Sequence, residues 1–269
     1  MLDAKNITYR VGNRELISNA DISFEQGRLH LVIGPNGAGK STLIKILAGV
    51  VRPQAGSVEY RGVDAAKISE SELARHRAVL SQAIEVAFPL SVREIVMMGR
   101  YPHFQGRPGS DDVRIVDELM ELFGVTEFRD RNYQTLSGGE RQRVNFARVL
   151  AQLWHGDQSS ERENRSETAQ AKYLFLDEPL TFLDIRHQIE FMKMIGDFAR
   201  RPNVVVIGVV HDLNLAARFA DRLVLIDGGR VAAAGAPAEV LTAERIRKVF
   251  GVEPEFVTTE RSGLHLIFD

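Results

Sequence analysis

Residues 34–41 have the types and spacing of a phosphate-binding loop. They read Gly34-Pro35-Asn36-Gly37-Ala38-Gly39-Lys40-Ser41 and fit the pattern GxxxxGK[ST]. Glycines let successive backbone N–H groups turn toward phosphate oxygens, and the lysine adds a full positive charge for the β- and γ-phosphates. The hydroxyl of Ser41 suits Mg²⁺. The pattern therefore predicts binding of a nucleoside triphosphate together with Mg²⁺.

The elements around this loop are those that the motif requires. The apolar run Leu29–Ile33 comes before it and predicts a strand, and Thr42–Leu47 comes after it with a helical pattern. A helix N-terminus favours anions because its backbone N–H groups are unpaired. We therefore include Thr42, at the start of this helix, among the predicted nucleotide-binding residues.

An acidic pair follows a second apolar run. Asp177 and Glu178 come directly after Tyr173–Leu176. In open α/β sheets, ligands bind at the carboxyl ends of parallel strands. There Asp177 would hold Mg²⁺, directly or through water, and Glu178 would orient or deprotonate the attacking water. Together with the phosphate-binding loop, the pair predicts hydrolysis of the γ-phosphate.

The strands that position these residues predict an α/β fold. Their apolar runs are continuous rather than alternating, which favours a mostly parallel sheet covered on both faces, with helices between the strands. The runs are Leu29–Ile33, Tyr173–Leu176, Val204–Val210 and Leu223–Ile226. Residues 91–153 are different because they contain helix signals, such as a possible capping box at Ser91 and Glu94 and helical spacing over Asp111–Phe123. We predict a helical subdomain inserted into the core.

The expected organisation follows from these patterns. Residues 155–171 form a polar run that we expect to be a solvated loop or a partly helical excursion. We expect one unit with a core over residues 1–87 and 172–235, a helical subdomain over 88–153, the polar insert at 155–171 and a C-terminal extension over 236–269.

Composition excludes several function classes. Of 269 residues, 44% are hydrophobic and 26% charged, as in an ordinary globular chain, and the net charge of −2 predicts no nucleic-acid partner. The absence of cysteine rules out disulfides and thiolate chemistry. The seven histidines are scattered, so we predict no bound heme and no metal other than Mg²⁺. The apolar run Val204–Val210 is far shorter than the roughly 20 residues of a membrane-spanning helix, and no secretory signal is recognised.

A further motif resembles the signature of a known family. Ser137 and Glu140 match a helix capping box, and Leu136-Ser137-Gly138-Gly139-Glu140 resembles the LSGGQ or LSGGE signature of the ATP-binding cassette family. Other family motifs follow in order along essentially the whole chain. Gln82 after an expected strand at 79–81 matches the Q-loop, Asp184 the D-loop, and His211 the H-loop.

This resemblance implies a P-loop NTPase (RecA-like) core that binds ATP and Mg²⁺. It also implies a head-to-tail homodimer in which Ser137, Gly138 and Gly139 of one chain close over the ATP of the other. In that arrangement His211 contacts the γ-phosphate, Gln82 acts in catalysis and binds Mg²⁺, and Asp184 links the two sites.

One position departs from the family pattern. The family usually stacks adenine on an aromatic residue just before a glycine near the N-terminus, but Val11 precedes Gly12 here. Tyr9 lies two residues earlier, on the same face if this segment is a strand. Either Tyr9 takes the place of the aromatic residue or Val11 makes a weaker apolar contact, and both remain candidates.

The cargo is implied by resemblance alone. Residues 99–103 and 214–217 are similar to importers of iron chelates, heme and cobalamin. Residues 149–154, followed by the polar insert, are similar to hemin-importer ATP-binding subunits. This implies import of hemin through two transmembrane permease subunits, with a periplasmic binding protein acting indirectly, at the cytoplasmic face of the bacterial inner membrane. The alternatives are a ferric siderophore or cobalamin.

Cassette ATPases of DNA repair and of translation are rivals from other classes. The former carry long heptad-rich coiled coils, which this sequence lacks, and the latter usually carry two cassettes in one chain. Within the importer class, the segment Phe88–Phe104 is expected to dock a short cytoplasmic helix of the permease, unless its apolar residues fill the subdomain core. Arg100 and Tyr101 are the surface residues that we expect to matter most there.

Overall fold

The centre of the molecule is a mostly parallel sheet. The computed structural model describes residues 1–269 except 81–87, 105, 155–170, 182, 260–262 and 269. The strand order is β10-β9-β3-β8-β7-β6. The strands are β3 (Arg28–Ile33), β6 (Arg77–Leu80), β7 (Lys172–Leu176), β8 (Val204–Val209), β9 (Arg222–Asp227) and the antiparallel edge strand β10 (Arg230–Gly235). All six residues of β8 are buried, so the prediction of strands covered on both faces is confirmed.

A second, antiparallel sheet packs against the first helix. It has the order β2-β1-β4-β5 and consists of β1 (Leu2–Val11), β2 (Arg14–Phe24), β4 (Ala55–Tyr60) and β5 (Val63–Asp64). Its inner face shares a core with α1 (Lys40–Leu47), through contacts that include Ile7, Phe24 and Ile44. The sequence analysis misses this sheet because β2 alternates buried and exposed positions along its second half, as strands with one wet face do.

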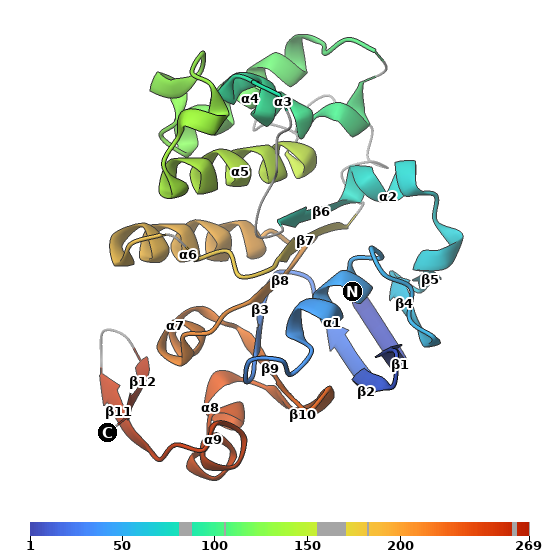
Figure 1. The fold of residues 1–269 in the computed structure, drawn as a ribbon, viewed down its shortest axis with the longest axis vertical. Helices are drawn as coiled ribbons and strands as arrows, with labels where there is room; N and C mark the ends of the chain where they lie inside the picture. The colour runs from blue at the N-terminus through green and yellow to red at the C-terminus, as the bar shows by residue number, and fades with distance from the viewer. Residues whose placement is uncertain (81–87, 105, 155–170, 182, 260–262, 269) are drawn as a thin grey trace.

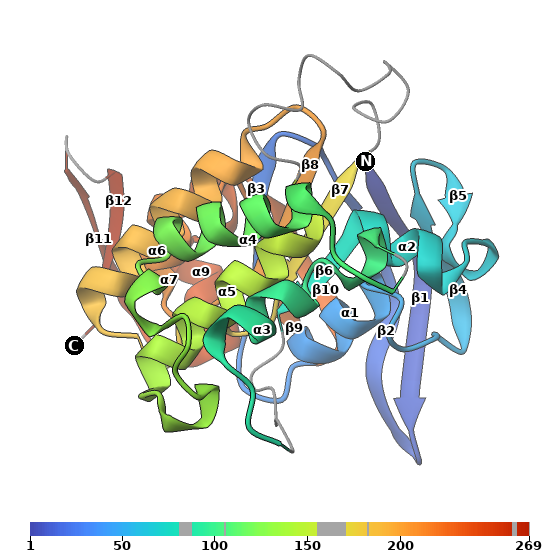
Figure 2. The same cartoon turned by 90° about the horizontal axis from the view of Figure 1, so that it is seen from above.

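Helices occupy the chain between β6 and β7, as expected. They are α3 (Val92–Met98), α4 (Ser110–Leu122) and α5 (Gly138–Leu153), and they lie together beyond the β6 edge (Figures 1 and 2). The capping box predicted at the start of α3 is confirmed, because the Ser91 N–H donates to Glu94 Oε2 at 2.7 Å and the Glu94 N–H donates to Ser91 Oγ at 3.3 Å. The fold class is thus α/β with a helical insertion.

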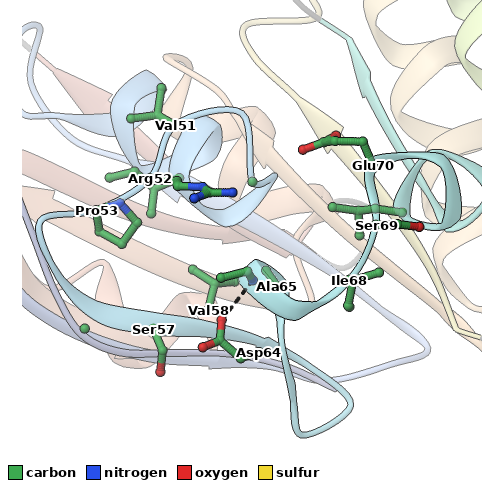
Figure 3. Close-up of a pocket in the computed structure, with 15 residues that line it drawn as sticks. Val51, Arg52, Pro53, Ser57, Val58, Asp64, Ala65, Ile68, Ser69 and Glu70 are labelled. Atoms are coloured by element: carbon green, nitrogen blue, oxygen red, sulfur yellow. Dashed lines mark hydrogen bonds between the residues drawn. The ribbon is translucent and has the colours of Figure 1, made fainter.

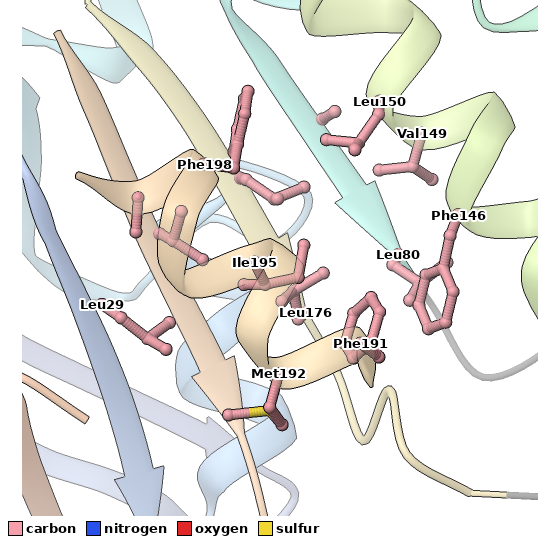
Figure 4. Close-up of a cluster of buried hydrophobic side chains, with 14 of the residues drawn as sticks. Leu29, Leu80, Phe146, Val149, Leu150, Leu176, Phe191, Met192, Ile195 and Phe198 are labelled. Atoms are coloured by element: carbon pink, nitrogen blue, oxygen red, sulfur yellow. The ribbon is translucent and has the colours of Figure 1, made fainter. Parts of the chain in front are cut away.

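This helical region shares its core with the sheet. Phe146 of α5 stacks on Phe191 of α6 (Ile185–Ala199), with ring centroids 3.9 Å apart. Leu80 and Leu176, from β6 and β7, belong to the same cluster (Figure 4). The start of α5 is therefore held in a defined position relative to the strand ends by apolar contacts rather than by a linker.

The remaining helices, the C-terminal hairpin and the 3₁₀ turns complete the fold. They are α2 (Glu70–His76), α7 (Leu213–Phe219), α8 (Pro237–Val240), α9 (Ala243–Phe250), the hairpin β11 (Pro254–Thr259) and β12 (Gly263–Phe268), and 3₁₀ turns at Ala65–Lys67, Tyr101–His103, Thr126–Phe128 and Tyr133–Thr135. Most of the polar insert lies outside the described residues. No helix in the described part of the chain combines the length and apolar character needed to cross a bilayer.

Candidate nucleotide site

The phosphate-binding loop joins β3 to α1, as predicted. Gly34, Gly37 and Gly39 have φ values of 150°, 76° and 102°, in the region that favours glycine. A Cβ at Gly34 would overlap the carbonyl oxygen of Ile226, and a Cβ at Gly39 would overlap that of Leu16. The loop is therefore wedged between β9 and β2, and these close approaches require glycine.

Lys40 lies inside the loop. Its Nζ donates to the carbonyl oxygens of Gly34 and Pro35, each at 2.9 Å, and only 5% of the residue is exposed. Burial lowers the pKa of Lys40, while the nearby carboxylates of Glu178 and Asp177 act in the opposite direction. The first turn of α1, which includes Ser41 and Thr42, follows directly. A cation is thus held at the centre of the loop, where it can reach phosphate oxygens.

Asp177 and Ser41 fit a magnesium site. Asp177 is buried at the end of β7, and its side chain bonds to the Ser41 hydroxyl. Its Oδ1 is buried and has no hydrogen-bond partner among the described residues. Burial raises the pKa of this carboxyl. A buried carboxylate oxygen without a partner beside a hydroxyl is a donor set that Mg²⁺ prefers. Gln82, the third predicted ligand, lies outside the described residues.

Glu178 and His211 come together from neighbouring strands. His211 follows β8, Glu178 follows β7, and His211 Nε2 lies 2.8 Å from Glu178 Oε1. Glu178 has a φ of 52°, which is uncommon for a residue other than glycine. Such a conformation costs about 1–3 kcal/mol and persists where the surroundings fix it. The side chains of the two residues predicted to act at the γ-phosphate therefore hold each other in place.

The helix start with the signature residues is exposed. Ser137 caps α5, since its N–H donates to Glu140 Oε2 at 2.7 Å and its Oγ accepts the Glu140 N–H at 3.4 Å. These bonds lower the pKa of Glu140. Gly138 and Gly139 form the first turn, and Ser137 and Gly138 are exposed. The predicted capping box is confirmed, and the start of this helix is accessible to a second molecule.

Asp184 caps α6 at another exposed position. Its Oδ1 accepts the His187 N–H at 2.9 Å and lies 2.8 Å from His187 Nδ1. These bonds lower the pKa of Asp184. The adjacent Ile185 is 76% exposed, so an apolar side chain is accessible beside this cap. The start of α6 is therefore accessible, as the predicted role of Asp184 between two chains requires.

The two adenine candidates differ in burial. Both lie on β1, where Tyr9 is half-buried against the core shared with α1 and Val11 is 56% exposed. Tyr9 is therefore already packed within its own chain, and Val11 is accessible at the strand end. The choice between them stays a prediction.

Arg100 does not belong to a docking surface, so that expectation is wrong. It is buried, with Nε donating to Asp112 Oδ1 at 2.9 Å and Nη1 to the carbonyl oxygens of Ala151 and Trp154 at 2.7 and 2.8 Å. Burial lowers its pKa. The guanidinium is stable in the interior because its N–H groups are bonded to α4 and to the end of α5. Tyr101, by contrast, is 74% exposed.

Gln142 is a buried polar residue to which the sequence analysis assigns no role. It lies on α5, is 6% exposed, and donates from Nε2 to the carbonyl oxygen of Pro179 at 2.7 Å. The sequence does indicate that Gln142 is buried, because it stands four residues before Phe146 and so lies on the apolar face of the helix. A glutamine on that face requires a hydrogen-bond partner.

A separate cavity of about 400 Å³ lies away from these residues. It is lined by Ile46, Val51, Val58 and Ile68, among others, with Arg52 and Glu70 at its sides (Figure 3). Ile46 belongs to the last turn of α1, whereas the phosphate-binding loop precedes the first turn. This cavity is therefore not part of the nucleotide site.

Together, the strand–loop–helix around Lys40, the acidic pair and the exposed signature helix define an ATP-binding cassette. Residues 17–153 match the family model described as ABC transporter, and the chain belongs to that family. In sequence it is 43% identical to the hemin import ATP-binding protein HmuV of Gloeobacter violaceus, over 99% of this chain and 93% of that protein. It is also 43% identical to HmuV of Rhodopseudomonas palustris, over 94% of this chain and 91% of that protein.

Solved structures share the fold. A metal-chelate type ABC transporter in an inward-facing conformation superimposes with a TM-score of 0.78 at 23% identity, covering 100% of this chain and 96% of that one. A dimeric bacterial ABC transporter cassette superimposes with a TM-score of 0.73 at 23% identity, covering 88% and 99%. The fold class predicted from the sequence is confirmed.

Proposed function

We propose that this chain is the ATP-hydrolysing subunit that energises import of hemin through a partner membrane permease. Hydrolysis is supported by one observation above all: Asp177 and the Glu178–His211 pair lie at neighbouring strand ends beside the Lys40 loop. Asp177 Oδ1 is buried there and has no partner among the residues that the structure describes. The choice of hemin is supported by full-length relatives named hemin import ATP-binding proteins.

In this proposal each residue has a defined task. The backbone N–H groups of residues 34–42 and the Lys40 ammonium bind the phosphates. Ser41 and Asp177 hold Mg²⁺, with Gln82 as a further ligand, and the ion neutralises charge on the phosphate oxygens. Glu178 accepts a proton from the attacking water. His211 orients the Glu178 carboxylate through the 2.8 Å contact and contacts the γ-phosphate.

Two chains form two composite sites. The exposed start of α5, with Ser137, Gly138 and Gly139, covers the ATP held by the loop of the other chain, and Asp184 links the sites across the dimer. We infer a peripheral location at the cytoplasmic face of the bacterial inner membrane, bound to two permease subunits. A periplasmic binding protein supplies cargo to the permease and acts on this chain indirectly.

Reconstitution tests the cargo. The chain is purified with its permease, placed in liposomes, and assayed for ATP hydrolysis with the matching binding protein carrying hemin, cobalamin or a ferric siderophore. We expect hemin to stimulate hydrolysis and to enter the liposomes. Stimulation by cobalamin or by a ferric siderophore, and not by hemin, would replace the proposed cargo with that alternative and leave the ATPase assignment intact.

A further inference from the structure

The hydrogen bond from Gln142 to Pro179 joins two parts of the molecule with different tasks. Gln142 belongs to α5, whose start carries the signature residues, and Pro179 directly follows Glu178 in the core. The 2.7 Å bond is buried, so breaking it leaves an amide or a carbonyl unpaired away from water. The bond is therefore a strong contact between the helical region and the backbone that carries Glu178.

The carbonyl bound by Gln142 belongs to Pro179, the residue that directly follows the unfavourable backbone conformation of Glu178. Glu178 has a φ of 52° and precedes a proline, which further restricts its backbone. Its own carbonyl oxygen accepts the Thr181 hydroxyl at 3.2 Å. Pro179 has no N–H, so its carbonyl is the only hydrogen-bonding group of its backbone. Gln142 uses that group and thereby limits how the Glu178 backbone can relax.

Gln142 is also rigidly connected to the signature residues. It lies five positions after Ser137, within the first turns of a helix whose start is fixed by the capping box. A shift of this helix start moves Gln142 with it, because a helix of this length moves as a body. The Pro179 carbonyl would have to follow or lose its partner.

We propose that Gln142 is a positioning residue that ties the Glu178 carboxylate to the signature helix of the same chain. The inference rests on the proposed function, in which that helix covers the ATP of the other chain while Glu178 acts on the ATP of its own chain. Closure of α5 over one nucleotide thereby sets the geometry of the catalytic carboxylate at the other site. Gln142 touches neither nucleotide and acts through Pro179.

Steady-state hydrolysis by Gln142→Met tests this role. Methionine has a similar length and no donor. We expect kcat to fall about tenfold, because the Glu178 carboxylate is then held less precisely, while KM for ATP stays within about twofold. We also expect weaker cooperativity between the two sites. Unchanged kcat and cooperativity, in a folded variant, would overturn the proposal.

Gln152→Met is the matched control. Gln152 is also on α5 and also donates from its amide to backbone carbonyls, those of Ala74 and Arg77 at 2.7 and 2.8 Å, far along the helix from Glu178. We expect this variant to melt at a lower temperature and to keep the parent kcat. An equal loss of kcat in both variants would reduce Gln142 to a structural role and overturn the proposal.

Gln142→Glu supplies a second measurement, should the methionine variant fail to fold. A buried glutamate has a raised pKa, and only its protonated form can donate to the Pro179 carbonyl. We expect the ratio of its kcat to the parent kcat to rise as pH falls from about 8 to about 6. A flat ratio overturns the proposal. A parent chain without ATPase activity would instead contradict the proposed function.

Discussion

At the residue scale, the proposed hydrolysis depends on the pairing of Glu178 with His211. The two side chains come from neighbouring strands and meet at 2.8 Å, while Lys40 lies close enough for the carboxylate to affect its pKa. A carboxylate held by a histidine cannot rotate freely. It is therefore positioned to accept a proton from a water molecule in line with the γ-phosphate.

Glu178→Gln should bind ATP normally and lose nearly all turnover, because an amide cannot accept the proton of the attacking water. We expect a fall in kcat of at least about 100-fold, with an ATP-bound dimer accumulating. ATPase assays and size-exclusion chromatography with ATP measure the two effects. Hydrolysis within about threefold of the parent would show that another group is the base.

Asp177 should lower stability in the absence of nucleotide. Because burial raises its folded-state pKa above the ordinary 3.8, the ionised group destabilises the fold at every pH above that raised value. This penalty disappears as pH falls through the folded pKa. Asp177→Asn should therefore melt higher than the parent near pH 7, with a difference that shrinks in acid, and should lose Mg²⁺-dependent hydrolysis. A lower melting temperature at pH 7 would contradict this account.

At the scale of secondary-structure elements, α5 connects the signature residues with the backbone beside Glu178. Its start presents the signature residues, its second turn bonds to Pro179, and its later turns share a core with α6 and the sheet. A substitution at its exposed start should therefore affect contacts between chains and leave ATP binding by one chain intact.

Ser137→Arg tests that separation. The larger cation should block the helix start and prevent closure of the dimer, while ATP binding to one chain stays within about threefold of the parent. Fluorescent ATP titration gives the affinity, and size exclusion in the Glu178→Gln background gives the dimer fraction. Lys40→Ala is the comparison, because it removes the cation of the loop itself. A loss of affinity as large as that of Lys40→Ala would argue against composite sites.

At the scale of the whole molecule, we propose that exposed apolar residues of the segment Phe88–Phe104 contact the permease. Tyr101 is 74% exposed, and Phe88 and Met98 are also exposed, on the segment that includes α3. Met97, in contrast, packs partly into the core.

Met98→Ala with Tyr101→Ala should leave the isolated chain folded and active in ATP hydrolysis, because both side chains are largely outside the core. Association with the permease and uptake of hemin should fall sharply. Co-purification and uptake assays measure these effects. Arg100→Ala is the contrasting variant, since it leaves Asp112 buried without its partner and should cost about 3–5 kcal/mol of folding free energy. Normal uptake by the double variant would place the docking surface elsewhere.

The sequence by itself determined the parts of this protein that depend on local chemistry. The phosphate-binding loop, the capping boxes at Ser91 and Ser137, and the buried parallel strands are all readable because glycine spacing, capping pairs and continuous apolar runs act over a few residues. The second sheet was missed because strands with one wet face do not form continuous apolar runs.

Contacts between residues distant in the sequence could not be predicted in this way, because they form when the chain folds. Arg100 was expected at the surface, but the carbonyls at the end of α5 and the carboxylate of Asp112 satisfy its charge in the interior. Gln142 lies on the apolar face of α5, which predicts a buried hydrogen-bond partner, but that partner, Pro179, lies 37 positions away and no local pattern identifies it. The physical reason is the same for both residues: a buried polar group is fixed by its partners, and chain folding chooses those partners.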